Sequence, residues 1–272
     1  MDSVAWIAAD EWLFRFPKYD EVSLNLDKEV ALLPTVSSSV ELAIPNFEYV
    51  GKIMGRTYVG YRMIKGKVLS PKTYATLPRE SQKRLTSQLA KFLDALHSIP
   101  LSIAKSAGVT TNDMARTYKD ELFAAREFIF PQLSKTQQSL ISSWYEDYLS
   151  NEENFDYECR LLHADLSEEH ILFDEKKAEL VGIIDFGDLV ISDPAYEFKF
   201  LFEEYGLGFV KDIVEASSLD WGKNLAEKLR FWLNSNWVTD ILIHHKRKDF
   251  EERDKEIKRL SSSLSKLFLA EL

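Results

Sequence analysis

The chain has 272 residues, and 44 acidic against 34 basic side chains give it a formal charge of −10. Its 45% of hydrophobic residues is ordinary for a globular protein, which excludes a disordered, collagen-like or low-complexity chain. The acidic balance argues against a nucleic-acid partner and permits a cationic one. Since no apolar run approaches the roughly 18 residues of a membrane span and the start lacks a secretory pattern, we expect a cytoplasmic protein without a membrane partner. The single cysteine, Cys159, excludes an internal disulfide.

The first 63 residues predict a small, mostly β unit. Two apolar stretches, residues 4–7 and 12–16, are separated by Ala9, Asp10 and Glu11, which predicts a tight hairpin. A helix is expected over residues 24–33, limited by Pro34 because proline lacks a backbone N–H. Residues 47–50 and 58–63 predict a second pair of strands. We therefore expect an N-terminal lobe over residues 1–63.

From residue 64 onward the periodicity becomes mainly helical. The clearest helix covers residues 81–98, where apolar residues recur with helical spacing, and two more are expected over 113–128 and 136–148. Three short apolar strands follow, at 159–162, 171–173 and 180–184. Residues 196–272 are again helical and end in a charged helix, whose apolar face we expect to pack against the same chain: Phe250, Ile257, Leu260, Leu264 and Leu267. Residues 64–272 are thus the expected helical C-terminal lobe.

The chemistry lies among the three short strands. Asp165 follows His163 by two residues, His170 follows Asp165 by five, and Asp185-Phe186-Gly187 comes directly after the third strand. In the protein-kinase pattern, an Asp that accepts the hydroxyl proton is followed five residues later by a metal ligand, and a D-F-G supplies a second ligand. The spacing therefore predicts phosphoryl transfer from a nucleoside triphosphate.

On these motifs the chain resembles the aminoglycoside O-phosphotransferases, especially the branch that acts on the 2''-hydroxyl. Further similarity lies in residues 12–18, at Glu29, and in residues 61–66, 96–99 and 191–194. The resemblance implies a protein-kinase-like α+β fold with a small antiparallel β N-lobe and a larger, mainly helical C-lobe. It also implies a strand and a glycine-bearing turn before residues 2–6, so we expect a shortened N-lobe and an incomplete phosphate-covering loop, with Ser3 as its remaining phosphate contact.

The resemblance assigns the catalytic loop residue by residue. Asp165 is expected to be the base or the group that orients the hydroxyl, and His170 and Asp185 are expected to bind Mg²⁺. Because Mg²⁺ prefers oxygen ligands, weak binding by His170 or binding through water stays open. We expect His163 to brace the loop and Asp193 to cap a helix start.

The nucleotide contacts implied by the resemblance lie in the N-lobe. Arg15 stands where the family has a lysine, and its expected partner is Glu29, with Lys18 as the fallback cation. Arginine keeps its charge but has a planar fork in place of a point charge. Tyr61 favours GTP as the donor, although ATP stays open, and Met63 is the remaining expected nucleotide contact.

The substrate contacts implied by the resemblance are acidic and aromatic, as a cationic sugar requires. They are Glu203, Glu204, Trp237 and Asp240, while Asp188 either holds its loop or faces the substrate. The alternative interpretation is that Glu203 and Glu204 form a solvated helix end and that Trp237 is a core residue. His97 and the pair His244 and His245 lack a second set of metal ligands, so they are interpreted as structural or surface groups.

Together these features predict a monomeric, magnesium-dependent aminoglycoside phosphotransferase. It would transfer the γ-phosphoryl group of GTP or ATP to an aminoglycoside hydroxyl, expected to be the 2''-hydroxyl, and so confer antibiotic resistance. Two alternatives remain open at this point. One is a kinase of another small alcohol, such as a macrolide sugar or a metabolite, and the other is a nucleotide-binding pseudokinase, suggested by the incomplete glycine turn and Arg15.

Overall fold

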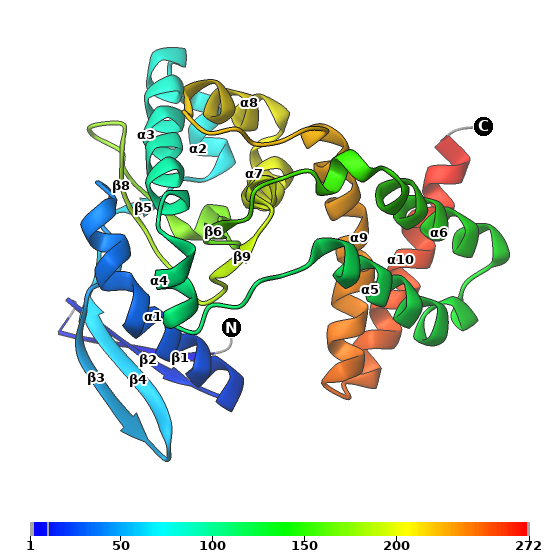
Figure 1. Ribbon diagram of the computed structural model, residues 1–272, viewed down its shortest axis with the longest axis horizontal. Helices are drawn as coiled ribbons and strands as arrows, with labels where there is room; N and C mark the ends of the chain where they lie inside the picture. The colour runs from blue at the N-terminus through cyan, green and yellow to red at the C-terminus, as the bar shows by residue number, and fades with distance from the viewer. Residues whose placement is uncertain (1–2, 10, 271–272) are drawn as a thin grey trace. The chain divides into compact units, whose positions relative to one another are not determined.

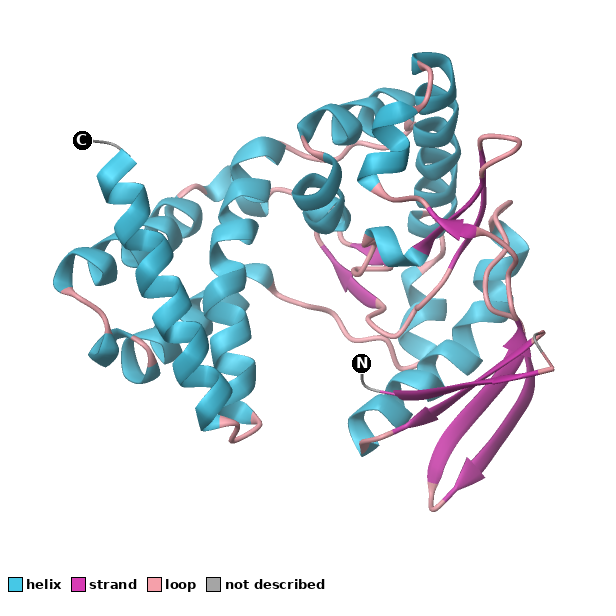
Figure 2. Cartoon of the chain, turned by 180° about the vertical axis from the view of Figure 1, so that it is seen from behind, coloured by secondary structure: helices cyan, strands magenta, loops and turns pink. Residues whose placement is uncertain are grey.

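The computed structural model describes residues 3–9 and 11–270, with side chains described as far as residue 264. It has a mixed α+β fold with a small antiparallel sheet in the N-lobe and a helical C-lobe, as predicted (Figures 1 and 2). The chain divides into two compact units: residues 1–112 with 158–221, and residues 113–157 with 222–272. The expected N-lobe lies entirely within the first unit, and its boundary at residue 63 stays a prediction.

The N-terminal sheet is antiparallel, with the strand order β1-β2-β4-β3 (Figure 1). Its two hairpins are β1 (Ser3–Ala8) with β2 (Trp12–Pro17), and β3 (Phe47–Ile53) with β4 (Arg56–Arg62). Both predicted strand pairs are therefore confirmed. Asp10, in the expected turn, lies outside the described residues, as do Met1 and Asp2, where the expected phosphate-covering turn falls.

The first helix corrects one prediction. Helix α1 covers Asp20–Ser39 and contains Pro34, which was expected to limit it. Proline costs a helix one backbone hydrogen bond, but the buried face continues beyond it. Leu26, Leu32 and Val36 are each fully buried, so packing on both sides of Pro34 outweighs the lost bond.

The rest of the first unit places short strands and helices around the catalytic loop. A three-stranded sheet has the order β5-β7-β8, and a two-stranded sheet pairs β6 with β9. The segment after α1 lies directly on β8, where the N–H of Ile183 donates to the carbonyl of Ala43 (2.9 Å). A Cβ atom at Gly182 would lie only 2.7 Å from the same carbonyl oxygen. This close approach of the two backbones therefore requires glycine at position 182. The elements are β5 (Lys67–Val68), α2 (Pro71–Thr76), α3 (Arg79–His97), α4 (Leu101–Ser106), β6 (Arg160–Leu162), the 3-10 turn η3 (Glu168–His170), β7 (Ile171–Asp174), β8 (Glu179–Ile183), β9 (Val190–Ser192), the 3-10 turn η4 (Pro194–Glu197), α7 (Phe198–Tyr205) and α8 (Leu207–Ala216).

The second unit is helical. It contains α5 (Met114–Phe128), the 3-10 turn η1 (Phe130–Gln132), α6 (Lys135–Ser150), the 3-10 turn η2 (Glu152–Phe155), α9 (Leu225–Lys246) and α10 (Phe250–Ala270). Aromatic rings fill its core, with Phe231 stacked on Tyr148 at a centroid separation of 3.9 Å. Ile257, Leu260 and Leu264 of α10 are buried and the helix packs on α9 and α6, as expected; Phe250 is exposed, and the Leu267 side chain lies outside the described part.

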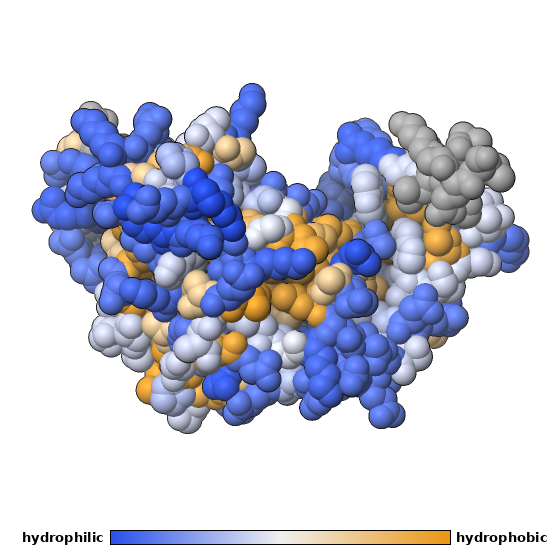
Figure 3. All heavy atoms as spheres, turned by 90° about the horizontal axis from the view of Figure 1, so that it is seen from above, coloured by the Kyte–Doolittle hydropathy of each residue, from blue (hydrophilic) through white to orange (hydrophobic). Residues whose placement is uncertain are grey.

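The surface in view in Figure 3 is mostly hydrophilic, with patches of hydrophobic residues between the hydrophilic ones. Across residues 3–9 and 11–270, no helix is both long enough and apolar enough to cross a membrane.

Candidate active site

Asp165, His170 and Asp185 meet the predicted nucleotide residues Ser3, Arg15 and Tyr61 in one cavity of the first unit. Its volume is about 590 Å³, within the usual range of about 300–1,000 Å³ for small-molecule sites. It is lined by strand β2, helix α1, the catalytic loop and the segment after β8. The lining side chains include Ser3, Arg15, Asn25, Tyr61, Asp165, Ser167, Glu169, His170, Asp185 and Asp188.

The loop after β6 presents Asp165 to this cavity, with its side chain about one quarter exposed. His163 lies beneath the loop and is fully buried, which lowers the pKa of its imidazole. One ring nitrogen lies 3.1 Å from the carbonyl of Ile184, and the other accepts the N–H of Asp165 (3.3 Å). His163 thus braces the loop between two strands, as the sequence predicts.

Glu197 is a residue that the sequence analysis missed. Its buried carboxylate accepts the N–H of His163 (2.6 Å) and the N–H of Ala164 (3.1 Å), and Nε2 of His97 lies 3.3 Å away. Ala164 has a φ of 66°, a left-handed conformation that costs an L-residue energy. The two hydrogen bonds to Glu197 therefore hold a strained turn immediately before Asp165. The sequence signal for Glu197 is an acidic residue inside the apolar run Ala195-Tyr196-Glu197-Phe198.

Asp193, two residues before this run, caps the start of η4 as expected, because its carboxylate accepts the N–H of Ala195 (2.9 Å).

His170 presents a definite tautomer to the cavity. Its Nδ1 lies 2.6 Å from the backbone carbonyl of Asp165, and because a carbonyl oxygen only accepts, Nδ1 carries the proton. In the neutral ring Nε2 then has a lone pair, and it faces Oδ2 of Asp185 at 3.8 Å. Asp185 itself has a φ of 61°, so the backbone at this position is also in the left-handed region.

This pair of side chains is close enough for one divalent cation to contact both. Two ligand bonds of about 2.1 Å, the Mg²⁺ distance, span at most about 4.2 Å, and Nε2 and Oδ2 are closer than that. Oδ1 of Asp185 accepts from Arg15, which leaves Oδ2 for a metal. No group of three or more His, Cys, Asp or Glu side chains suited to a metal occurs in the described part of the chain. An ion here would take its other ligands from phosphates and water, as Mg²⁺ usually does.

Arg15 connects the N-lobe sheet to both Glu29 and Asp185. Its Nη1 lies 3.0 Å from Glu29 Oε2, and its Nη2 lies 3.1 Å from Asp185 Oδ1. It lines the cavity together with Leu13, two residues earlier on β2, which is the alternation expected of a strand. Burial raises the pKa of Glu29 to about 7, against the opposing effect of Arg15. The structure thus forms the predicted pair of Arg15 with Glu29 and extends it to Asp185.

The other predicted nucleotide residues differ in their positions. Tyr61 lines the cavity and is buried, which raises the pKa of its hydroxyl to about 12. Ser3 also lines the cavity, and its hydroxyl is buried and has no hydrogen-bond partner in the described structure. Met63 has an exposed side chain outside this lining, and its N–H donates to the carbonyl of Glu11 (2.8 Å). Lys18 does not line the cavity either.

The predicted acceptor residues are distributed over both units. Asp188 lines the cavity. Glu203 and Glu204 lie on α7 of the first unit; Glu203 is exposed, whereas Glu204 accepts the N–H of Glu168 (2.6 Å) and burial raises the pKa of its carboxyl. Trp237 and Asp240 lie on α9 of the second unit, where Trp237 is 38% exposed. The contribution of these residues to acceptor binding stays a prediction.

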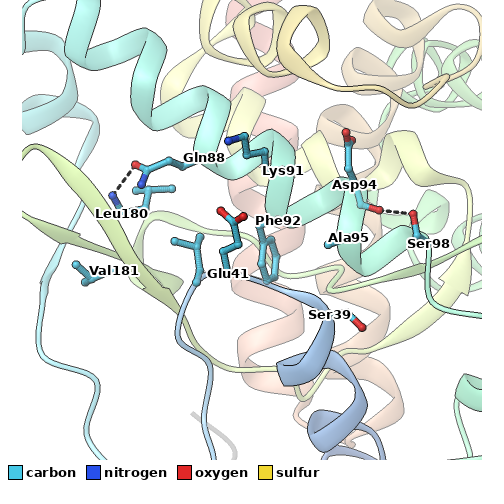
Figure 4. Close-up of a pocket in the computed structure, with 11 residues that line it drawn as sticks. Ser39, Glu41, Gln88, Lys91, Phe92, Asp94, Ala95, Ser98, Leu180 and Val181 are labelled. Atoms are coloured by element: carbon cyan, nitrogen blue, oxygen red, sulfur yellow. Dashed lines mark hydrogen bonds between the residues drawn. The ribbon is translucent and has the colours of Figure 1, made fainter.

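A separate cavity of about 530 Å³ lies between the end of α1, helix α3 and strand β8 (Figure 4). Gln88 and Asp94 contribute polar groups, but their partners are internal: Gln88 accepts the N–H of Leu180 (2.9 Å), and Asp94 accepts the N–H of Ser218 (2.8 Å). None of the predicted site residues lines this cavity, so we do not assign the chemistry to it.

Comparisons with known proteins agree with this geometry. A family model described as the phosphotransferase enzyme family (APH) matches residues 3–232. The solved GDP and kanamycin complex of APH(2'')-IIia is similar with a TM-score of 0.89 and 30% sequence identity, over 98% of this chain and 91% of that one. ADP-bound APH(2'')-Ib has a TM-score of 0.80 and 23% identity over 96% and 89% of the two chains. Macrolide 2'-phosphotransferase MphH from Brachybacterium faecium has a TM-score of 0.75 and 14% identity over 96% and 89%. The last two similarities concern the fold alone.

Proposed function

Because this chain belongs to the phosphotransferase enzyme family and is a small-molecule kinase, we propose that it transfers the γ-phosphoryl group of GTP, or of ATP, to an aminoglycoside. The observation that carries the proposal is the convergence of Asp165, His170, Asp185 and Arg15, which Glu29 holds, on one cavity. A similar protein at 30% identity was solved with GDP and kanamycin, which supports this donor and this acceptor class. We propose the 2''-hydroxyl as the acceptor atom on the same resemblance.

In the proposed mechanism Asp165 orients the acceptor hydroxyl and receives its proton. Its carboxylate reaches the cavity on a turn that Glu197 and His163 hold rigidly from below. A positioned base of this kind typically contributes about 10²–10⁴-fold to the rate. The rigidity matters because phosphoryl transfer depends mainly on positioning and on charge stabilisation.

Arg15 and Ser3 are proposed to contact the phosphates of the donor. Arg15 is the one lysine or arginine among the described residues that line the cavity, and Glu29 fixes its direction through two hydrogen bonds. Ser3 offers a buried donor without a partner in the described structure, which suits a phosphate oxygen. His170 and Asp185 would hold Mg²⁺, which neutralises charge on the transferring phosphoryl group when it is bound.

The acceptor is proposed to be cationic because the cavity is strongly acidic. Four carboxylates line it, from Asp165, Glu169, Asp185 and Asp188, against a single guanidinium. Glu203, Glu204, Trp237 and Asp240 are proposed as further acceptor contacts, and Tyr61 and Met63 as contacts of the purine. We also propose that the enzyme acts as a monomer in the cytoplasm and that the reaction gives aminoglycoside resistance.

The direct test is turnover of the purified chain with Mg²⁺ and GTP or ATP against kanamycin, gentamicin and a macrolide, with products identified by mass. We expect singly phosphorylated aminoglycosides, with NMR placing the phosphate on the 2'' position. Phosphorylation of the macrolide alone would contradict the acceptor class. Phosphorylation of another aminoglycoside hydroxyl would contradict the proposed 2'' position but not the proposed acceptor class.

A further inference from the structure

Glu169 is a cavity residue without a role in the proposed mechanism. It lies on η3, four residues after Asp165, and its side chain is exposed and lines the same cavity. Within the described part of the chain its carboxylate makes no hydrogen bond or ion pair. A carboxylate with no internal partner at the side of a ligand cavity is available to a ligand.

The turn that carries Glu169 is held from α7. The carboxylate of Glu204 accepts the N–H of Glu168 at 2.6 Å, and the carbonyl of Ser167 accepts the N–H of His170 at 3.1 Å. Hydrogen bonds to a charged acceptor are worth about 1.5–3 kcal/mol, roughly twice neutral ones. Glu204 therefore fixes the backbone next to Glu169, which gives Glu204 a positioning role in addition to any contact with substrate.

The charges of the cavity assign Glu169 to the acceptor. Arg15 and the unpartnered hydroxyl of Ser3 are donors, which suit the phosphates. Of the carboxylates, Asp165 is proposed to serve the hydroxyl and Asp185 the metal. The negative charge of Glu169 is used neither in binding the donor nucleotide nor in accepting the proton of the hydroxyl. We therefore expect it to bind a cationic group of the acceptor.

We propose that Glu169 is a specificity-determining residue that pairs with an ammonium group of the acceptor near the reacting hydroxyl, on a turn positioned by Glu204. The inference rests on the proposed function. It explains how the catalytic loop itself could discriminate a polycationic sugar from a neutral alcohol, because one segment of six residues, 165–170, carries Asp165, Glu169 and His170.

The test combines Glu169→Gln with kanamycin derivatives in which one ammonium at a time is neutralised by N-acetylation. With the unmodified chain, acetylation of the ammonium that meets Glu169 should raise KM about tenfold, the low end for a charged hydrogen bond because the side chain is exposed. Glu169→Gln should raise KM for kanamycin by about the same factor, and the same acetylation should then have no further effect. The KM for nucleotide should stay unchanged.

The control variant is Glu175→Gln, which removes one charge from the exposed turn after β7, outside the cavity. It should leave KM for every derivative unchanged, which separates a local contact from the net charge of the protein. For the positioning role, Glu204→Ala should raise KM for kanamycin, and Glu204→Gln should restore it in part, because the amide oxygen still accepts the N–H of Glu168 but no longer carries a charge for the acceptor.

Each outcome decides a different point. If Glu169→Gln and each acetylation raise KM independently, so that the variant still loses affinity on every acetylation, Glu169 does not bind an acceptor ammonium. The same conclusion follows if Glu169→Gln raises KM for the nucleotide. If Glu204→Gln is as impaired as Glu204→Ala, the positioning role is wrong. If the unmodified chain phosphorylates no aminoglycoside at all, the proposed function fails and this inference fails with it.

Discussion

Replacement of Glu197 by alanine tests the physical basis of the catalytic loop. The substitution leaves the buried N–H of His163 and the partly buried N–H of Ala164 without an acceptor, and it removes the hydrogen-bond partner of His97. Two hydrogen bonds to a charged acceptor, at about 1.5–3 kcal/mol each, give a loss of roughly 3–6 kcal/mol. This is a large part of the roughly 5–15 kcal/mol that stabilises a typical domain.

The left-handed turn at Ala164 adds a functional consequence, since strained backbone persists only where its surroundings hold it. We therefore expect Glu197→Ala to lower the free energy of unfolding by about 3–6 kcal/mol and to lower kcat even at temperatures where the variant is folded. Glu197→Gln should have an intermediate effect, because its amide has only one accepting oxygen for the two N–H groups.

Urea denaturation followed by circular dichroism measures the first effect, and turnover at saturating substrates measures the second. Glu175→Gln serves as the control, since an exposed ion pair such as that of Glu175 with Lys67 contributes about 0–1 kcal/mol. A Glu197→Ala protein within about 1 kcal/mol of the unmodified chain and with unchanged kcat would refute the reasoning.

Three further predictions concern other residues of the site. Burial raises the pKa of Glu29 from 4.5 to about 7, so between these values the folded state keeps a proton that the unfolded chain has lost, and stability should fall as pH rises. Glu29→Gln should remove up to roughly 3 kcal/mol of this decrease in the free energy of unfolding, measured by denaturant titrations at pH 4.5 and 7.5. If the free energy of unfolding changes equally with pH in the variant and the unmodified chain, the raised pKa of Glu29 is wrong. His170→Asn replaces a nitrogen ligand by an oxygen and should lower the Mg²⁺ concentration needed for half-maximal rate by about threefold. An unchanged requirement would argue against His170 as a ligand, and a higher one would contradict a preference of this site for oxygen. Tyr61→Ala should increase kcat/KM for ATP relative to GTP, and an unchanged ratio in competition assays would remove Tyr61 from nucleotide selection.

Much of the fold could be predicted because its signals are local. The two N-lobe hairpins, the helix over 81–98 and the three short strands follow from short apolar runs or helical spacing. Strands β5 and β9 were missed because two or three residues carry no periodicity. The end of α1 was wrong because the burial that continues the helix past Pro34 comes from tertiary packing.

The candidate site shows the same division between local and tertiary information. Asp165, His170 and Asp185 follow from spacing within one short segment, and the structure brings them together. Glu197 could not be found in that way, because its role depends on a turn 33 and 34 residues earlier in the chain. Trp237 and Asp240 were predicted by resemblance and lie in the second unit, so their role remains a prediction.

The central claim is that Asp165 serves phosphoryl transfer to an aminoglycoside in this cavity, and the most direct measurement compares the unmodified chain with Asp165→Asn. Both proteins would be given Mg²⁺, GTP and kanamycin, and phosphorylated kanamycin would be quantified by mass spectrometry. We predict that Asp165→Asn keeps the unfolding transition and nucleotide affinity but forms product about 10²–10⁴-fold more slowly. Equal rates of product formation by the two proteins would contradict the account.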